Sequence, residues 1–422
     1  MVNKTYRTPI CILVFVAVIQ LSFFLPRADA SASAPFKVSA NAAVLIDALS
    51  GKVIFGQNPQ ERISPASLVK LMTLYLAHDA LKAGVVKPDD AVIISEKAWA
   101  TQGSKMFVEV GKTVSFEKLL EGIASISGND ACVAVAEHLA GLEDTFTVKM
   151  NEKAHALGMV NSHFKNANGL PENDQYTTAM DIGLLSYHYL KDHPEALKLH
   201  SIKEFSFGGI TQHNRNKLLW LNEGVDGLKT GWIDDHEGFH LIATAKRNDQ
   251  RFIAIVMGAQ NPRTRENEAL KLLNYGFKNF STVELFKAGE SIATIDVWKG
   301  KSAQVSLTTD GPIVLTLPMG EEKNLSVTKT FPKRIFAPVP KGKKIGGLEI
   351  TLKGELLNKI DLIAQDEVPQ AHLIKRLSHT VFLSFILKPY WGWIVLPLVL
   401  LSLCIFIMII RKPVKSNPLS HL

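Results

Sequence analysis

The stretch Ala42–Tyr75, AAVLIDALSGKVIFGQNPQERISPASLVKLMTLY, contains two different patterns in succession. Its first half has two short apolar runs around a Leu-Ser-Gly turn, which predicts a β-hairpin with strands at 42–48 and 52–56. Its second half has Pro65 just before a dense apolar run, which predicts a helix near 67–83 that is buried on most of its surface. A strand pair followed by a buried helix opens an α/β domain.

The rest of this domain extends the same order. Apolar periodicity predicts more helices and then strands, which is compatible with an antiparallel sheet covered by helices. The predicted helices lie near 115–126, 130–140, 144–157, 178–190 and 264–277, and the predicted strands near 203–212, 227–231, 239–245 and 252–257.

Ser67 and Lys70 lie in the first turn of the predicted helix, three residues apart. That spacing places both side chains on one face, so the lysine amine can reach the serine hydroxyl. A serine hydroxyl is a weak nucleophile until a base removes its proton. Burial and a second cation such as Lys229 would lower the pKa of a lysine enough for it to act as that base. The pattern therefore predicts Ser67 as nucleophile and Lys70 as general base.

The Ser-x-x-Lys pattern is weak by itself, because it occurs three more times in the chain. These copies begin at Ser115, Ser162 and Ser326, and each is interpreted as a surface serine with a solvated lysine. The copy at Ser67 differs because it stands at a helix start. The backbone N–H of Ser67 also faces that start and can serve as half of an oxyanion hole.

Two more short motifs follow, Ser127-Gly128-Asn129 and Lys229-Thr230-Gly231. Taken singly, the first fits a helix cap and the second fits an edge strand with a glycine. Taken in this order, the three motifs are those of penicillin-binding proteins and class A β-lactamases. The lysine and threonine offer donors to a substrate carboxylate, and the glycine lets a substrate backbone approach the strand.

Longer stretches resemble the D-alanyl-D-alanine carboxypeptidases, the low-molecular-mass penicillin-binding proteins of serine peptidase family S11. The resemblance runs from about residue 36 to 280, with a looser match to about 370. It implies a transpeptidase-like or β-lactamase-like α/β (α+β) fold with a five-stranded sheet. The stretches that carry it are Ala42–Tyr75, SGNDACVAVAEHLAG from Ser127, NANGL from Asn166, TQHNRNKLLW from Thr211 and VDGLKTG from Val225.

The resemblance also implies a role for each matched residue. Ser67 would be acylated with Lys70 as base, and Ser127 would relay a proton to the leaving D-alanine. Asn129 would hydrogen-bond to Lys70 and to the substrate amide. The other implied roles are carboxylate binding by Lys229, Thr230 and Arg215, close backbone approach at Gly231, an oxyanion donor in the backbone N–H of Trp232, and a nearby cation at Arg265, which is equally interpreted as a helix-surface charge.

The sequence departs from the family directly after this third motif. Trp232 and Ile233 replace the usual His or other aromatic and Thr, and an acidic run, Asp234-Asp235-His236-Glu237, follows. A backbone donor does not depend on its side chain, so acylation should survive. Substrate preference and the deacylation rate are the properties that this difference affects.

The two ends of the chain have the composition of export and membrane segments. Residues 1–30 have basic residues, an apolar run and an Ala-x-Ala site, which predicts a signal peptide. Residues 371–389 mix basic and apolar residues, which suits a helix in the membrane interface. Residues 390–410 open with aromatic residues and then lack charge, and 411–422 begins with basic residues. This predicts a transmembrane helix at 390–410 with a cytoplasmic tail and an enzyme outside the cell or in the periplasm.

Between these ends we predict a catalytic domain at 31–280 and a small all-β domain at 281–370. Cys132 is the one cysteine in those domains, so no disulfide is expected within them. The net charge of +7 is scattered, without the basic stripe typical of nucleic-acid binding. No cofactor or metal is expected, and the oligomeric state stays open.

The resulting functional prediction is a penicillin-sensitive D,D-carboxypeptidase that removes the terminal D-alanine from peptidoglycan stem pentapeptides through an acyl-enzyme. β-Lactams would be covalent inhibitors, and membrane lipid would be a further partner. A D,D-endopeptidase, a transpeptidase or a weak β-lactamase on the same site remains an alternative, although the chain lacks the E-x-x-L-N-type element of class A β-lactamases. A non-catalytic peptidoglycan-binding scaffold is the third alternative.

Overall fold

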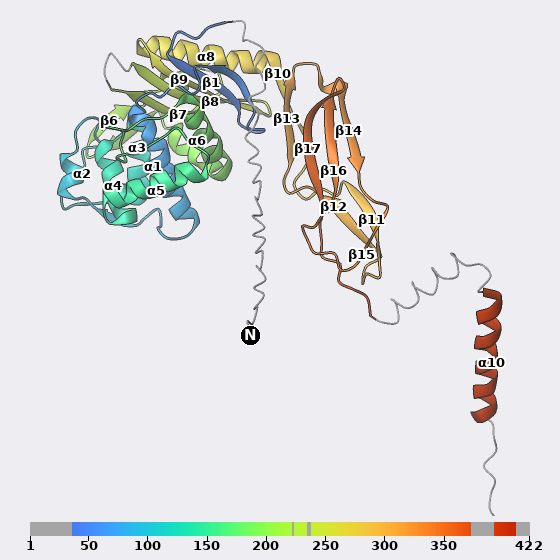
Figure 1. The fold of residues 1–422 in the computed structure, drawn as a ribbon. Coiled ribbons are helices and arrows are strands. Elements are labelled where there is room, and N and C mark those ends of the chain that lie inside the picture. Colours follow the sequence, from blue (N-terminus) through green and yellow to red (C-terminus); the bar gives the residue numbers. More distant parts are fainter. Residues whose placement is uncertain (1–35, 222, 234–237, 373–391, 411–422) are drawn as a thin grey trace, which may run out of the picture. The chain divides into compact units, whose positions relative to one another are not determined.

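The computed structural model describes residues 36–221, 223–233, 238–372 and 392–410 (Figure 1). The predicted signal peptide at 1–30, the acidic run at 234–237, nearly all of the predicted interfacial segment and the predicted tail at 411–422 lie outside the described residues. The described residues therefore comprise the catalytic and β-rich regions and one C-terminal helix.

The catalytic region is built on a five-stranded antiparallel sheet, as the resemblance implied. β1 is buried along its whole length because it lies inside the sheet, between β2 and β9. β7 forms one edge, so one side of this strand is open to neighbours other than a strand. The order is β2 (Val53–Gln57), β1 (Ala42–Asp47), β9 (Gln250–Ala259), β8 (Phe239–Arg247) and β7 (Val225–Trp232).

Helices cover both faces of this sheet (Figure 1). Gly276 of α8 packs against Phe252, whereas Gly183 of α6 packs against Ile46 and Ile255. Positions 252 and 255 of β9 are an odd number of residues apart, so their side chains point to opposite faces of the sheet and meet different helices. The helices are η1 (Ala66–Val69), α1 (Lys70–Lys82), α2 (Glu96–Ala100), α3 (Phe116–Ile126), α4 (Asn129–Ala140), α5 (Glu143–Ala156), α6 (Ala179–Asp192), η2 (Pro194–Ala196), α7 (Leu197–His200), η3 (Lys217–Trp220) and α8 (Pro262–Asn279).

Short elements are where the sequence-based prediction fails. The strand predicted at 203–212 is a hairpin, β5 (Glu204–Phe207) and β6 (Ile210–His213), because Gly208 and Gly209 both adopt positive φ and turn the chain. The short helix α2 and the strand pair β3 (Ala91–Ile93) and β4 (Thr113–Ser115) carry too few residues for a periodic signal.

Residues 280–372 are all β, as predicted, apart from one short 3-10 turn. This region contains a six-stranded sheet in the order β14-β16-β17-β12-β11-β15 and a separate pair, β10-β13. Its apolar side chains form their own core, which includes Leu307, Leu348 and Leu362. The elements are β10 (Phe280–Phe286), β11 (Ala293–Trp298), β12 (Gln304–Thr308), β13 (Ile313–Pro318), η4 (Glu322–Asn324), β14 (Leu325–Thr330), β15 (Arg334–Phe336), β16 (Lys344–Leu352) and β17 (Glu355–Ala364).

The C-terminal helix α10 (Gly392–Ile410) carries no charged residue. Its side chains are described for residues 396–407. Over the described part of the chain, no helix has the combination of length and apolar character that crossing a membrane requires.

Candidate active site

The structure brings Ser67 and Lys70 into direct contact. Ser67 lies in η1 and Lys70 is the first residue of α1, so the two side chains share one turn. Lys70 Nζ donates to Ser67 Oγ at 2.9 Å and to the carbonyl oxygen of Asn168. The lysine is fully buried, whereas the serine lines a cavity. A buried amine that contacts an accessible hydroxyl is the arrangement that serine activation requires.

Burial also sets the protonation of this lysine. The pKa of Lys70 is lowered to about 8, chiefly by loss of hydration; the cation of Arg215 acts in the same direction, and Cys132 and Asp130 oppose it. Burial, followed by the charges of Lys70 and Arg215, holds the pKa of Lys229 well below its usual range. The expected effect of a second cation on Lys70 therefore comes from Arg215. A substantial fraction of Lys70 is neutral at mildly alkaline pH and can accept a proton.

The turn that carries the nucleophile is under backbone strain. Ala66, directly before Ser67, has a φ of 49°, in the left-handed region that residues with a Cβ rarely adopt. Gly169 packs on this turn with a φ of 84°, and a Cβ at Gly169 would lie 1.9 Å from the carbonyl oxygen of Ala66. The glycine is required for this close approach. The loop 166–170 therefore holds the turn of the nucleophile in place.

Ser127 and Asn129 lie at the junction of α3 and α4. Ser127 has a φ of 64°, and its buried hydroxyl has no hydrogen-bond partner in the described part of the chain. The Asn129 side chain donates to the carbonyl oxygen of Gln102 at 2.6 Å, while its Oδ1 accepts from no described group. The expected bond between Asn129 and Lys70 is thus not formed. The Lys70 amine binds the Asn168 carbonyl, and the Asn129 amide is turned toward the loop at 102–104.

The third motif lies on the edge strand β7, beside η1. Lys229 is buried and donates to the carbonyl oxygen of Thr230 at 3.0 Å. A Cβ on Gly231 would lie 3.3 Å from Ala66 Cβ and Leu68 Cγ. The glycine thus allows η1 to pack against the strand, a role that the sequence did not predict. Trp232, at the end of β7, is half exposed and stacks on Phe239 with a centroid distance of 5.8 Å.

Two arginines complete this side of the site. Arg265 lies on α8 but is buried, and its guanidinium donates to the carbonyl oxygen of Arg215 at 3.3 Å. The alternative of a helix-surface charge at Arg265 is therefore wrong. Glu266 lies 3.6 Å from this guanidinium, too far for a strong hydrogen bond. The two guanidinium groups give the site a positive potential suited to a carboxylate.

A cavity of about 440 Å³ opens onto the nucleophile. Its lining includes two segments to which the sequence assigned no role, 103–104 and 168–171. The second contains an Asn-Gly turn signal, but nothing in the sequence connects it to Lys70. Among the residues that the structure covers, no group of His, Cys, Asp and Glu is arranged to hold a metal ion. The cavity is lined by Ser67, Gly103, Ser104, Asn129, Asn168, Gly169, Leu170, Pro171, Arg215, Thr230, Gly231, Trp232, Ile233 and Arg265.

Comparison with known families agrees with this geometry. Residues 28–261 match the D-alanyl-D-alanine carboxypeptidase family of peptidase class S11, and residues 280–370 match the C-terminal domain of penicillin-binding protein 5. The chain is 39% identical to the D-alanyl-D-alanine carboxypeptidase DacA of Escherichia coli over 357 residues, which is 83% of this chain and 88% of that protein. It is 36% identical to DacF of Bacillus subtilis over 380 residues, 86% of this chain and 95% of that protein.

Solved structures give the same result. The fold is similar to penicillin-binding protein 5 of Haemophilus influenzae, with a TM-score of 0.74, 36% identity and coverage of 80% of this chain and 99% of that one. It is also similar to the ampicillin-bound penicillin-binding protein D2 of Listeria monocytogenes, with a TM-score of 0.53, 30% identity and coverage of 57% of this chain and 98% of that one. The chain therefore belongs to the D-alanyl-D-alanine carboxypeptidases of peptidase family S11 and is a serine-type D-Ala-D-Ala carboxypeptidase.

Proposed function

We propose that this carboxypeptidase acts on peptidoglycan stem pentapeptides through an acyl-enzyme on Ser67. Neutral Lys70 takes the proton of the Ser67 hydroxyl as Oγ attacks the carbonyl carbon of the penultimate D-alanine. The backbone N–H groups of Ser67 and Trp232 stabilise the resulting oxyanion. The bond to the terminal D-alanine then breaks, and its nitrogen receives the proton through Ser127. Water hydrolyses the ester and restores Ser67.

The terminal carboxylate of the substrate is assigned to the positively charged side of the cavity. Arg215 and Thr230 line that cavity together with Arg265, and Lys229 is buried behind it. A carboxylate that leaves water gains most from such charge-assisted hydrogen bonds. β-Lactams, which also carry a carboxylate beside a reactive carbonyl, are proposed as covalent inhibitors of the same site. The ampicillin-bound and cefotaxime-bound forms of the Listeria protein support this proposal.

The observation that carries the mechanism is the 2.9 Å contact between Lys70 Nζ and Ser67 Oγ. The direct test is to incubate the purified chain with a peptide ending in D-Ala-D-Ala and to follow the products by mass spectrometry. We expect loss of one alanine residue and, with penicillin, an adduct on the tryptic peptide that contains Ser67. An adduct on a peptide containing Ser115, Ser162 or Ser326 would contradict the assignment.

We also propose that the enzyme is exported and held at the outer face of the cell membrane. Residues 1–30 would be removed as a signal peptide, 371–389 would lie in the interface and 390–410 would span the bilayer. The support is the sequence, where an uncharged run with an aromatic start is followed by Arg411 and Lys412. In intact cells, external protease should cleave the catalytic domain and spare a tag placed after Leu422. Release of the full-length chain by carbonate would contradict a spanning helix.

A further inference from the structure

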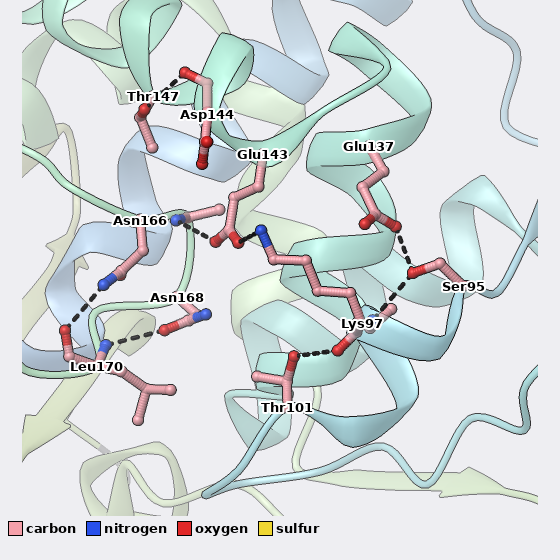
Figure 2. A network of polar contacts seen from close by, with 12 residues as sticks. Ser95, Lys97, Thr101, Glu137, Glu143, Asp144, Thr147, Asn166, Asn168 and Leu170 are labelled. Carbon is pink, nitrogen blue, oxygen red and sulfur yellow. Dashed lines mark hydrogen bonds and ion pairs between the residues drawn. The ribbon is translucent and has the colours of Figure 1, made fainter.

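The ion pair between Lys97 and Glu143 lies outside the cavity but connects two of its walls (Figure 2). Glu143 is the first residue of α5, and one carboxylate oxygen accepts the backbone N–H of Ala167 at 3.0 Å. The other oxygen lies 2.8 Å from Lys97 Nζ. Lys97 belongs to α2, which leads directly into the wall segment 103–104. The pair therefore joins this wall to the opposite loop, 166–170.

The loop 166–170 is braced by hydrogen bonds from its own side chains. The Asn166 side chain accepts from the N–H of Gly169 at 2.7 Å and donates to the carbonyl oxygen of Leu170 at 2.9 Å. The Asn168 side chain accepts the N–H of Leu170 at 2.8 Å (Figure 2). Internal bonds of this kind transmit a displacement at one end to the other. The hydrogen bond from Ala167 to Glu143 therefore helps to fix the position of the whole loop.

This loop reaches the general base through two carbonyl groups. The carbonyl oxygen of Ala167 accepts from Thr73 Oγ1 at 2.7 Å, one turn after Lys70 on α1. The carbonyl oxygen of Asn168 accepts from Lys70 Nζ itself. Glu143 thus binds the N–H of Ala167, and the carbonyl of Ala167 is bound to α1. The next residue, Asn168, binds the Lys70 amine. The effect of Glu143 on the reaction passes through the peptide backbone.

The carboxylate needs its cation because of where it lies. The Glu143 side chain is 8% exposed, whereas that of Lys97 is 55% exposed. A buried carboxylate is costly without a partner, so the cation of Lys97 is needed beside it. The hydrogen bond to Glu143 raises the pKa of Lys97. α2 is also held at its N-cap residue, Ser95, whose Oγ donates to Glu137 at 2.6 Å.

A direct chemical role for Glu143 is less consistent with these contacts. Both of its oxygens are engaged, and the residue is not among those that line the cavity. We propose that Glu143, paired with Lys97, is a positioning residue that fixes the 166–170 loop and thereby the Lys70 amine against Ser67. This proposal rests on the assignment of Lys70 as the base.

The test separates binding of penicillin from the acylation step in the full-length chain. Glu143→Ala should lower the first-order acylation rate constant about tenfold, because small displacements of reacting groups are costly. The dissociation constant of the preceding complex should change much less than this rate constant, because Arg215, Thr230 and Arg265 on the carboxylate-binding side of the cavity are not in the displaced loop. Glu143→Gln should restore only part of the rate, because an amide oxygen can still accept from Ala167 while the ion pair with Lys97 is lost. The matched control is Glu121→Ala, which removes a 2.6 Å pair with Lys118 on α3, whose two side chains do not line the cavity.

An acylation rate constant for Glu143→Ala equal to that of the Glu121→Ala control would overturn the proposal. So would equal losses in Glu143→Gln and Glu143→Ala. If Glu143→Ala does not fold, Lys97→Met tests the pair while leaving α5 and its hydrogen bond to Ala167 intact. We expect a slower acylation step there too, and a wild-type rate would reject the pair. Normal acylation by Lys70→Arg would instead show that the base assignment is wrong, independently of Glu143.

Discussion

The same four-residue pattern, Ser-x-x-Lys, occurs both in the catalytic region and in the β-rich region. Ser67 and Lys70 lie on one helical turn, and their reactive atoms are 2.9 Å apart. Ser326 and Lys329 lie on β14, where a spacing of three residues places side chains on opposite faces. Lys329 Nζ donates to the carbonyl oxygen of Ile292 at 3.0 Å. Identical residues therefore have different chemistry because the backbone geometry differs.

The two other copies also lack the catalytic arrangement, each for its own reason. Ser115 precedes α3, and Lys118 pairs with Glu121 at 2.6 Å on a partly exposed surface. Ser162 Oγ donates to Asp181 at 2.8 Å, so its hydroxyl is already used. Lys70 differs in being fully buried and in contacting an accessible serine. Desolvation supplied by distant segments turns the pattern into a catalytic pair.

The largest expected effect comes from removing the nucleophile. Ser67→Ala should abolish both the penicillin adduct and release of D-alanine, because the oxygen that forms the ester is gone. Ser326→Ala is the matched control and should label like the parent chain. Labelling with fluorescent penicillin and gel analysis measures both. Penicillin labelling of the Ser67→Ala protein would show that the Ser-x-x-Lys copy in the catalytic region is not the site of acylation.

Replacing the base should give the next largest effect. Lys70→Arg should slow acylation by about 10²–10⁴-fold, because a guanidinium stays protonated and cannot accept the serine proton. Lys329→Arg should not change the rate, since that lysine contacts a carbonyl oxygen in the β-rich region. Stopped-flow acylation by a chromogenic cephalosporin measures each rate constant. Wild-type acylation by Lys70→Arg would exclude Lys70 as the base.

The pKa of Lys70 predicts the pH dependence of acylation. Burial lowers this pKa to about 8, and only the neutral amine can accept a proton. The acylation rate should therefore rise as the pH increases toward 8 and level off above it. The neutral fraction grows about 50-fold between pH 6 and pH 8. A rate that falls with pH over this range would show that the protonated amine is the active form.

A smaller effect is expected from Gly169→Ala. Its Cβ would lie 1.9 Å from the Ala66 carbonyl oxygen, and the residue has a φ of 84°. Strain and overpacking together should lower the free energy of unfolding by about 2–5 kcal/mol and displace the turn of the nucleophile. Gly354→Ala, at a φ of 86° with open space around it, should lower the free energy of unfolding only through backbone strain, by about 1–2 kcal/mol. Equal losses in chemical denaturation would argue against the contact with Ala66.

The smallest effect should come from an exposed ion pair of the β-rich region. Lys359 and Glu349 lie 2.7 Å apart, with side chains 67% and 43% exposed. Exposed pairs contribute little because water already solvates both charges. Lys359→Met should leave both the melting midpoint and the acylation rate unchanged, as differential scanning calorimetry and penicillin labelling can check. A clear decrease in the melting midpoint or in the acylation rate would show that this exposed ion pair contributes to stability or activity.

The sequence predicted elements whose signals come from near neighbours in the chain. The β1–β2 hairpin, the helix start at Ser67 and the longer helices follow from apolar periodicity, prolines and glycines. α2 and the β5–β6 hairpin were missed because a few residues carry no readable period. The order of the three motifs identified the residues of the site, but their contacts were only partly foreseen. The expected bond from Asn129 to Lys70 is absent, and of the two interpretations of Arg265 the structure supports the cation near the site.

By itself the sequence determined which residues are candidates for the chemistry, because short motifs and helix signals are local properties. Tertiary structure decided which of them meet and how dry their surroundings are. Lys70 and Asn168 are 98 positions apart, and nothing in either segment indicates that they touch. The same holds for Gly169 against Ala66 and for Lys97 against Glu143. A pKa is lowered by the exclusion of water, and that exclusion requires several distant segments to pack around one amine.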